Sequence, residues 1–424
     1  MWHELIWSAP FAALLLCIAI LPLVRKHWWE KNYPLVSLGL GLVVVLHYLV
    51  GLKNSESLIH TGIEYISFII LIGSLYVVAG GIHINVKGES TPIINCVFLV
   101  LAAISANFLG TTGASMVFIR PWIRMNKYRL TAFHIVFFIF IVSNIGGGLT
   151  PIGDPPLFLG YLKGVPFFWV LENALPIWLT AIGILLTIFF VMDSSNFSKA
   201  PKKIREKETG HEEEWRFAGM QNVFFLLVII SAVFINHPRF LREVIMASAA
   251  FFSYRTTPKQ IHEQNHFEFG PIKEVAILFL GIFATMIPTL EWLEHNAAAL
   301  GIRTVGQFFW CSGSLSAVLD NAPTYLNFLS AASGLFAGPA ESLNHTSDVA
   351  FLLAEKSKYI LAISVGSVFF GAVTYIGNGP NFLVKSIADA AKAKTPSFFG
   401  YFFRFSLPIL IPLFILIWAL FFRT

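Results

Sequence analysis

Long apolar segments, separated by short polar ones, follow one another along nearly the whole chain. A helix needs about 20 apolar residues to cross the hydrocarbon core of a bilayer. The pattern therefore predicts an all-α polytopic membrane protein with about ten full spans. We expect these spans at residues 5–24, 34–52, 61–82, 130–149, 166–191, 221–235, 241–253, 274–291, 357–376 and 398–421.

Two further apolar stretches, 92–119 and 304–337, have small and polar residues at their centres. Each fits a re-entrant hairpin, which enters and leaves the membrane on the same side, better than a straight span. Charge placement supports this interpretation. With the N-terminus outside and both stretches folded as hairpins, 20 of the 29 Lys and Arg residues fall on the inner side and 8 on the outer side. This bias agrees with the positive-inside rule for membrane proteins.

Composition agrees with a membrane location. Hydrophobic residues make up 56% of the chain and charged residues 12%, with a mean hydropathy of +0.70. Soluble domains carry roughly 25% charged residues. The net charge of +5 comes without a basic run interleaved with aromatic residues, so we expect no nucleic-acid partner. The lipid bilayer is the expected surroundings of most of the chain.

Two sequence patterns of the first half recur in the second. Leu149–Leu159 (LTPIGDPPLFL) matches Val373–Leu383 (VTYIGNGPNFL) at an offset of 224 residues. Ala106–Ala114 (ANFLGTTGA) matches Ser316–Thr324 (SAVLDNAPT) at an offset of 210. Because the two expected hairpins enter from opposite sides, this repeat has inverted topology. Inverted repeats with broken helices are typical of secondary transporters, whose sites lie near the membrane midplane.

The repeat divides the chain into four parts. Residues 1–33 form an extra N-terminal helix and a cytoplasmic loop, and residues 34–191 form the first inverted repeat. Residues 192–240 form a cytoplasmic linker with a connecting helix, because they include a stretch rich in both charge signs. Residues 241–424 form the second inverted repeat.

The segment Ser143–Pro156 (SNIGGGLTPIGDPP) is expected to break a membrane helix. Its glycines and prolines interrupt regular helix, and the freed backbone groups are tolerated only inside protein or beside a watery cavity. A proline kink that serves packing alone would not explain Asp154, because an aspartate at the bilayer centre costs on the order of 3 kcal/mol. We therefore expect this segment to bind a cation through Asp154 and the freed carbonyl groups.

A second break follows at Thr374–Asn381, with Asn378 where the first break has Asp154. Here a structural kink is a competing explanation. The hairpin tips mirror the breaks: Gly110–Gly113 is neutral, and Asp320–Thr324 carries an acid. If each tip faces the break of its own half, each half holds one acid. Two such carboxylates would suffice for exchange of sodium and protons, since both cations compete for a carboxylate.

The chain lacks the motifs of membrane-bound enzymes and ATP-driven pumps. Neither GxxxxGK[ST] nor HExxH occurs in it. An intramembrane enzyme would need a close catalytic pair such as two aspartates, and the internal repeat argues against that. We therefore expect no enzymatic activity and no cofactor besides the transported or coupling ions, sodium and protons.

At these motifs the chain resembles the ion transporter superfamily, which includes NhaD-type sodium/proton antiporters, ArsB-type arsenite pumps and citrate or dicarboxylate carriers. The resemblance rests on Ser143–Pro156, Asp320–Thr324 (DNAPT) and Tyr375–Phe382 (YIGNGPNF) and covers about residues 34–421. It is closest to the subgroup described as citrate transport or sodium:proton antiport proteins. The resemblance implies paired hairpins whose tips meet the helix breaks, a homodimer and an elevator-like motion.

The resemblance also implies two cation sites. The first would use Thr111, Thr112, Asn144, Thr150 and Asp154, and the second Asp320, Asn321, Thr324, Thr374 and Asn378, with Ser143 and Asn381 beside them in the breaks and sodium held by Asp154 and Asp320. One departure affects the number of coupled ions: related antiporters often carry an acid–amide pair where this chain has Gly110-Thr111.

Sodium/proton antiport fits two core acids without an obvious cationic residue at the midplane. The alternative is a sodium- or proton-coupled citrate or dicarboxylate symporter, since helix dipoles, Ser, Thr and Asn can bind carboxylates. Arsenite efflux would favour an exposed thiol, but Cys17, Cys96 and Cys311 lie away from the motifs. In either main case we expect a multi-pass protein of the bacterial inner (plasma) membrane.

Overall fold

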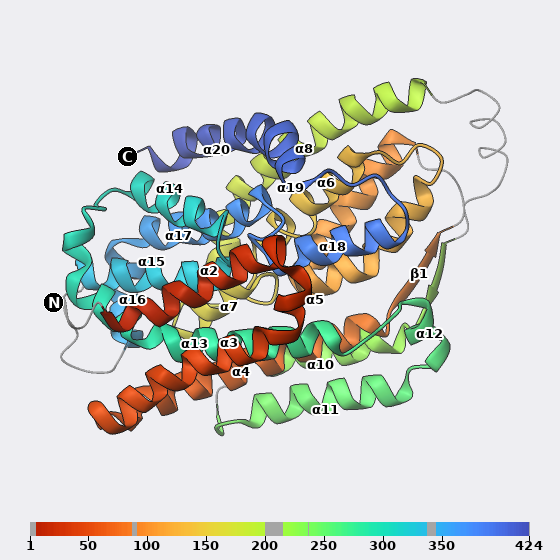
Figure 1. The fold of residues 1–424 in the computed structure, drawn as a ribbon. Helices are drawn as coiled ribbons and strands as arrows, with labels where there is room; N and C mark the ends of the chain where they lie inside the picture. Colours follow the sequence, from red (N-terminus) through yellow and green to blue (C-terminus); the bar gives the residue numbers. More distant parts are fainter. Residues whose placement is uncertain (1–5, 87–90, 200–214, 236, 337–344, 424) are drawn as a thin grey trace.

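The computed structural model describes residues 6–86, 91–199, 215–235, 237–336 and 345–423. Helices make up most of these ranges (Figure 1). The first half contains η1 (Ile6–Ser8), α2 (Ala9–Val24), α3 (Lys26–Leu46), η2 (His47–Gly51), α4 (Ser55–Gly80), β1 (His83–Val86), α5 (Pro92–Met125), α6 (Ala132–Ile141), η3 (Ile145–Gly147), α7 (Pro155–Leu162) and α8 (Trp169–Ser198).

The second half follows the strand β2 (Trp215–Ala218). It contains α10 (Gln221–Val233), α11 (Leu241–Thr256), α12 (Lys259–Gln264), α13 (Gly270–Asn296), η4 (Ala297–Leu300), α14 (Val305–Ser316), α15 (Asn321–Phe336), α16 (His345–Glu355), α17 (Ser357–Phe370), η5 (Gly371–Val373), α18 (Gly379–Ala390), α19 (Phe398–Tyr401), η6 (Phe402–Leu410), α20 (Ile411–Ile417) and η7 (Trp418–Phe422).

The apolar helical segments of the described ranges cover nine of the ten expected spans and the first expected hairpin, and the helix at the tenth expected span, 241–253, is not among them. Within the described ranges, six helical segments are long and apolar enough to cross a membrane. Four shorter apolar helical segments accompany them: Ile6–Pro22, Ala132–Gly147, Gln221–Val233 and Ser357–Val373. The chain is therefore an all-α polytopic membrane protein, as the hydrophobic pattern predicts.

The helices pack in two layers (Figure 1). The long-helix layer contains α2, α3, α4, α10, α11 and α13, and the hairpin layer contains α5 to α8, α14, α15, α17, α18 and α20. In the long-helix layer, α3 and α13 approach closely because Gly281 has no side chain: a Cβ there would lie 2.2 Å from Ser37 Oγ. The Ser37 hydroxyl donates across this contact to Ile277 O at 2.9 Å.

The first re-entrant hairpin is α5, which reverses at Gly110. This glycine has φ 73° and ψ 154°, a conformation that side-chain-bearing residues rarely adopt. The two arms then run back to back, so that Asn95 Nδ2 reaches Asn126 Oδ1 at 2.8 Å. Phe98 and Trp122 stack between the arms with ring centroids 5.6 Å apart. The hairpin predicted for residues 92–119 is thus confirmed and extends to Met125.

The second hairpin consists of α14 and α15, joined by four residues. Thr304 starts it with a capping box, and the rings of Phe308 and Phe328 meet between the arms at 6.2 Å. The base of α5 lies beside β1, whereas α14 begins and α15 ends at the opposite end of the molecule (Figure 1). The two hairpins therefore enter the hairpin layer from opposite sides, as the inverted repeat requires.

Both broken helices are present at equivalent positions. The first runs through α6, η3 and α7, and the second through α17, η5 and α18. Asp154 has φ −141° and ψ 141° just before α7, and Asn378 has φ −154° and ψ 138° just before α18. Two residues that are 224 positions apart thus have the same extended backbone at the same point of the break.

The same hydrogen bonds also recur in the two halves. The Thr150 hydroxyl donates to Asn107 O at 2.6 Å, and the Thr374 hydroxyl donates to Ala317 O at 2.6 Å. Each hydroxyl also accepts from the glycine amide three residues later, at 3.1 Å in both halves. These pairs have the offsets of 224 and 210 found in the sequence. Each threonine therefore fastens its helix break to the hairpin of its own half.

Some element bounds differ from the sequence expectations. The helix expected from residue 34 begins at Lys26, so residues 26–33 are helical rather than a loop. The helix expected from residue 61 begins at Ser55, because the Asn54 side chain accepts from the Ser57 amide at 3.2 Å and caps its N-terminus. Residues 200–214 of the expected linker, which include most of its charged stretch, lie outside the described residues.

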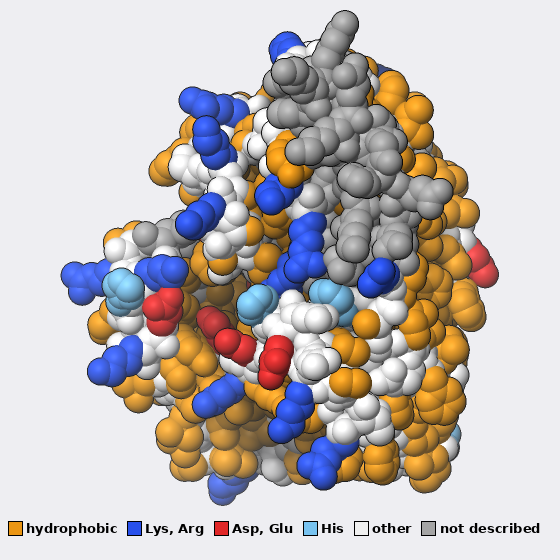
Figure 2. Space-filling model, turned by 90° about the vertical axis from the view of Figure 1, so that its right-hand side faces the viewer, with side chains coloured by type: hydrophobic (Ala, Val, Ile, Leu, Met, Phe, Trp, Pro, Cys, Tyr) orange, Lys and Arg blue, Asp and Glu red, His pale blue; other side chains and the backbone are white. Residues whose placement is uncertain are grey.

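A short antiparallel sheet was not expected. In it, β1 pairs with β2, with His83 opposite Ala218. The sheet holds the end of α4 beside the start of α10, at one end of both layers (Figure 1). Figure 2 shows that this face carries many Lys and Arg side chains around a hollow. Such a charge distribution agrees with the assignment of this face to the inner side of the membrane.

Candidate functional site

The two helix breaks and the two hairpin tips meet in the middle of the hairpin layer. Asp154 lies at their meeting point and is 1% exposed. It is the last residue before α7, whose first two positions are prolines, so the helix begins directly after it. The local sequence thereby places one carboxylate at the N-terminal end of a buried helix, where the helix dipole favours negative charge.

Asp154 accepts hydrogen bonds from three other segments. Its Oδ1 accepts from Thr111 Oγ1 at 2.9 Å and from Asn378 Nδ2 at 3.2 Å. Its Oδ2 accepts from Asn321 Nδ2 at 2.7 Å. These partners come from the first hairpin tip, the second break and the second hairpin tip. Every hydrogen-bond donor that the described residues offer to this carboxylate is therefore neutral.

Asparagine side chains join the two breaks around this acid. Asn144 Nδ2 donates to Asn381 Oδ1 at 2.7 Å, and Asn378 Nδ2 lies 3.1 Å from Ser143 O. Asn381 in turn donates to Thr374 O at 2.9 Å within its own break. All five residues are buried. The two halves thus meet through a polar network in an otherwise apolar layer.

Asp320 lies close to this network, but its surroundings differ from those of Asp154. Its side chain is partly exposed, and its Oδ1 accepts from the Ala322 amide at 3.0 Å at the start of α15. The Thr324 hydroxyl donates to Asp320 O at 2.9 Å. Asp320 is near enough to Asp154 for the two carboxylates to repel each other. The next residue, Asn321, has a buried Oδ1 for which the described residues provide no hydrogen-bond partner.

The geometry does not keep the two expected cation sites apart. Asn321 and Asn378, which the resemblance assigned to a second site, both donate to Asp154. Each tip contacts the break of its own half, and the second tip in addition reaches Asp154 of the first break. Thr150 and Thr374 use their hydroxyls to hold the backbone of the breaks. The polar residues gather around one acid, with Asp320 beside them.

Thr112 lies apart from the others. It lines a small pocket of about 30 Å³ between the first hairpin tip and α4, together with Leu71, Leu75 and Phe158. This volume corresponds to roughly one water molecule in the liquid. The Thr112 side chain thus faces the contact between the two layers rather than the Asp154 carboxylate.

One residue of the site was not singled out from the sequence. Asn107 is buried on the first hairpin, where its Nδ2 donates to Gly146 O at 2.7 Å and its Oδ1 accepts from the Leu149 amide at 3.0 Å. It thereby satisfies backbone groups that the broken helix leaves free. Its position could have indicated this role, because Asn107 is a polar residue within an apolar run, three residues before the hairpin glycine Gly110.

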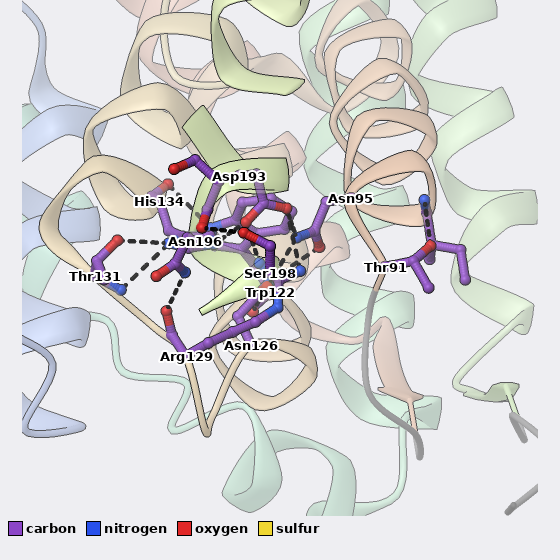
Figure 3. Close-up of polar contacts among 12 residues, drawn as sticks. Thr91, Asn95, Trp122, Asn126, Arg129, Thr131, His134, Asp193, Asn196 and Ser198 are labelled. Atoms are coloured by element: carbon purple, nitrogen blue, oxygen red, sulfur yellow. Dashed lines mark hydrogen bonds and ion pairs between the residues drawn. The ribbon is translucent and has the colours of Figure 1, made fainter. Parts of the chain in front are cut away.

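A second buried acid, Asp193, lies near the inner end of the hairpin layer (Figure 3). It forms an ion pair with Arg129 through both carboxylate oxygens. Asn95 Nδ2 donates to Asp193 Oδ2 at 2.8 Å, and His134 Nε2 lies 3.0 Å from Asp193 Oδ1. These residues come from α8, the α5–α6 connection, α5 and α6. The ion pair therefore fastens the base of the first hairpin to two neighbouring helices.

The hydrogen bonds around His134 indicate its tautomer. The Thr131 amide donates to His134 Nδ1 at 3.2 Å, so Nδ1 acts as an acceptor. The proton of a neutral imidazole is then on Nε2, which donates to Asp193. No sequence pattern groups these residues. His134 is a buried residue that supplies a specific hydrogen bond to Asp193.

A third polar contact joins the two layers. Lys163, directly after α7, lies 2.8 Å from Glu64 Oε1 on α4. The side chains retain only 13% and 10% exposure, respectively. The sequence alone does not assign a role to Glu64, and the structure gives this acid a partner in the opposite layer.

Comparison with known proteins agrees with this arrangement. A family model described as "Putative citrate transport" matches residues 2–422. The chain belongs to this family. A search of curated proteins gives no match. With its apolar helices and membership of a transporter family, the chain is a multi-pass membrane protein of the secondary transporter type, and the resemblance to the ion transporter superfamily is confirmed.

Proposed function

We propose that this transporter exchanges sodium ions for protons at Asp154, with Asp320 as a neighbouring second acid. The observation that supports this most strongly is the environment of Asp154, a carboxylate that is 1% exposed and hydrogen-bonded only to neutral groups among the described residues. An ionised group buried in this way is costly unless a counter-charge compensates it. A proton or a cation supplies that compensation, and the two compete for the same oxygens.

The oxygen atoms around Asp154 fit a sodium ion as the transported substrate. Hard cations prefer carboxylate, carbonyl and hydroxyl oxygens. Besides the two carboxylate oxygens, this region offers Thr111 Oγ1, Ser143 O and the unpartnered Oδ1 of Asn321. A rotated Asn321 amide would turn its oxygen toward Asp154, replacing a donor with a ligand. Sodium binding would then displace the proton from the carboxylate.

Sodium- or proton-coupled transport of citrate or a dicarboxylate is the second candidate. The description of the family supports it. The side-chain amides of Asn321 and Asn378 would in that case donate to the anion while Asp154 and Asp320 held the coupling cations. In both cases we propose a homodimer in the bacterial inner membrane that moves its hairpin layer against its long-helix layer.

Proton movement in proteoliposomes tests the proposal. Wild type, Asp154→Asn and Asp320→Asn would be reconstituted with an acidic lumen, and lumenal pH would be followed after addition of sodium, lithium, potassium or citrate. Asp389→Asn is the matched control, because it neutralises an exposed acid on α18. We expect sodium alone to raise the lumenal pH in wild type and Asp389→Asn, with at least a tenfold loss in Asp154→Asn.

Two outcomes would decide against antiport. A wild-type protein that ignores sodium alone but takes up citrate in a sodium- or proton-dependent manner would establish the second candidate. An Asp154→Asn protein that still exchanges sodium for protons at the wild-type rate would show that the exchanged proton binds elsewhere.

A further inference from the structure

Three buried polar atoms of the hairpin layer are left without a hydrogen-bond partner among the residues that the structure describes. They are Asn321 Oδ1, Tyr325 Oη and Ser367 Oγ, and the three residues are 0% exposed. Buried polar groups in native proteins are nearly always hydrogen-bonded, either to protein or to ordered water. The asparagine oxygen can only accept, whereas the two hydroxyls can donate and accept. A water molecule, which also does both, is a ligand that suits all three.

The first two of these atoms belong to one face of α15. Asn321 and Tyr325 are four residues apart, about one helical turn, so their side chains are neighbours on the helix surface. The Tyr325 hydroxyl lies against α7, because a Cβ on Gly160 would be only 2.3 Å from Tyr325 Oη. The two side chains therefore face α7, the short helix that begins directly after Asp154.

The third atom comes from the neighbouring helix α17. Ser364 lies close to Tyr325, but its hydroxyl donates to Ile360 O at 2.8 Å, and the two hydroxyls are not in hydrogen-bond geometry. Helix α15 leads from the hairpin tip toward the outer end, and α17 returns from there to the second break (Figure 1). Ser367, three residues after Ser364, therefore lies on the same side of α17 but nearer the level of Asn321. The three atoms line one seam between α7, α15 and α17.

This seam begins at the Asp154 carboxylate. Asn321 Nδ2 donates to Asp154 Oδ2 at 2.7 Å and is the one donor that the described residues give this oxygen. A carboxylate oxygen has two lone pairs, so Oδ2 can also accept from water. Gly160 follows Asp154 by six residues, about 9 Å along a helix axis. A few hydrogen-bonded water molecules cover this distance, with Asn321, Ser367 and Tyr325 as their protein partners.

The other end of the seam lies close to the outer face. Gly164, roughly one helical turn after Gly160, is exposed. The Tyr161 hydroxyl donates to Val233 O at 2.9 Å, and Val233 ends α10 on the side away from β2. Because the sheet marks the inner side, α7 ends on the outer side. The Tyr325 hydroxyl, which lies against Gly160, is therefore close to the outer end of this layer.

We propose that bound water molecules fill this seam and carry protons between Asp154 and the outer face. A protonated Asp154 gives its proton to the adjacent water, which releases another proton to the next acceptor, so only O–H bonds break and form. The Tyr325 hydroxyl relays in the same way, because it accepts one proton while it donates its own. The Asn321 oxygen has no proton to pass on and holds the first water in place.

The proton role rests on the proposed sodium/proton exchange, whereas the presence of water in the seam does not. Radiolytic hydroxyl-radical labelling of the full-length protein in lipid nanodiscs, read by mass spectrometry, tests the water. Radicals form from water where it is bound, so we expect Tyr325 to be oxidised at least fivefold faster than Tyr401. Tyr401 is the matched control, because it is also 0% exposed but its hydroxyl donates to Ala372 O at 2.7 Å. Equally slow oxidation of both tyrosines would overturn the water chain.

Proton flux and sodium binding in Tyr325→Phe test the proton role. The variant removes the hydroxyl and keeps the ring. We expect proton flux in proteoliposomes to fall at least fivefold, while binding of radioactive sodium to the purified protein changes less than twofold. The control Tyr359→Phe removes a hydroxyl at the start of α17 that donates to Arg303 O at 2.9 Å, and it should change the flux less than twofold.

A second variant guards against misfolding. Ser367→Ala removes another hydroxyl of the seam, is expected to slow proton flux at least twofold, and decides if Tyr325→Phe does not fold. Wild-type flux in both variants would overturn the proton path. A parallel loss of flux and sodium binding in Tyr325→Phe would overturn it too, because the hydroxyl would then serve the cation site. If the wild-type protein exchanges no protons for sodium, the proposed function fails, and fast oxidation of Tyr325 would still support the water chain.

Discussion

Two buried aspartates of the hairpin layer differ in what balances their charge. Asp193 is 0% exposed and pairs with Arg129, with His134 and Asn95 completing its hydrogen bonds. Asp154 is 1% exposed and has only neutral donors among the described residues. Burial alone therefore does not distinguish a functional acid from a structural one.

The two carboxylates differ in whether a positively charged side chain of the protein already occupies them. The Asp193 carboxylate is neutralised by a side chain of the same layer, so an additional cation would have to displace the guanidinium. Within the part of the chain that the structure describes, the Asp154 carboxylate has no such partner, and its neutral donors can rotate away or reverse. Removing an acid that has an internal counter-charge leaves that counter-charge buried and unpaired, whereas an acid without one is available to an exchangeable cation.

Asp154→Asn gives the largest expected effect and separates activity from stability. We expect sodium-driven proton movement to fall at least tenfold, while thermal unfolding occurs at the wild-type temperature or above it. The physical reason is that an amide removes an uncompensated buried charge and keeps the shape of the side chain. Activity is measured as proton flux, and stability as the thermal unfolding curve of the same preparation. A variant that loses its fold together with its activity would contradict the comparison.

Asp193→Asn is expected to reduce the stability of the fold, whereas Asp154→Asn is expected to reduce activity without loss of stability. Removing one partner of a buried ion pair costs about 3–5 kcal/mol, because Arg129 would remain buried without its counter-charge. We expect a lower unfolding midpoint and a smaller folded fraction in fluorescence-detected size-exclusion chromatography. The double variant Asp193→Asn/Arg129→Gln should recover part of this loss. A stable but inactive single variant would instead place Asp193 in the transport reaction.

His134→Gln is expected to have the smallest effect, and it tests whether the Asp193 cluster is purely structural. Glutamine can still donate to Asp193 but loses the acceptor for the Thr131 amide. We expect a destabilisation of about 1 kcal/mol, typical of one hydrogen bond, with the apparent sodium affinity unchanged. The measurement is a chemical unfolding midpoint together with the sodium dependence of proton flux. A shift in sodium affinity without loss of stability would not fit a purely structural cluster.

The internal repeat and the two hairpins could be predicted from the sequence, because their backbone conformations require particular residue types such as glycine and proline. Glycine at position 110 and the prolines and glycines of the breaks are unusual inside apolar helices, and they indicate where the regular helix is interrupted. Asp154 was found in the same way, since a lone acid in an apolar motif is costly. These features depend on local sequence and therefore do not require knowledge of how distant segments pack.

The Asp193 cluster and the contacts of the second half's asparagines with Asp154 could not be predicted, because they depend on how distant segments pack. Asn95 and Asp193 are 98 residues apart and lie near helix ends, where polar residues are common. The contacts of Asn321 and Asn378 with Asp154 depend on how the two halves dock against each other. The β1–β2 pairing joins two four-residue strands whose paired residues, from Val86–Trp215 to His83–Ala218, are 129 to 135 positions apart.

The hydrogen bond between Asn378 and Asp154 also bears on how a duplicated gene becomes a transporter. Two identical halves would place the same residue at both positions, with their side chains 3.2 Å apart. Two aspartates there would repel each other or share one proton, and two asparagines would offer no charge for a cation. Divergence of a single position after duplication resolves this conflict. The present pairing of one carboxylate with one amide therefore requires that the two copies differ at this position.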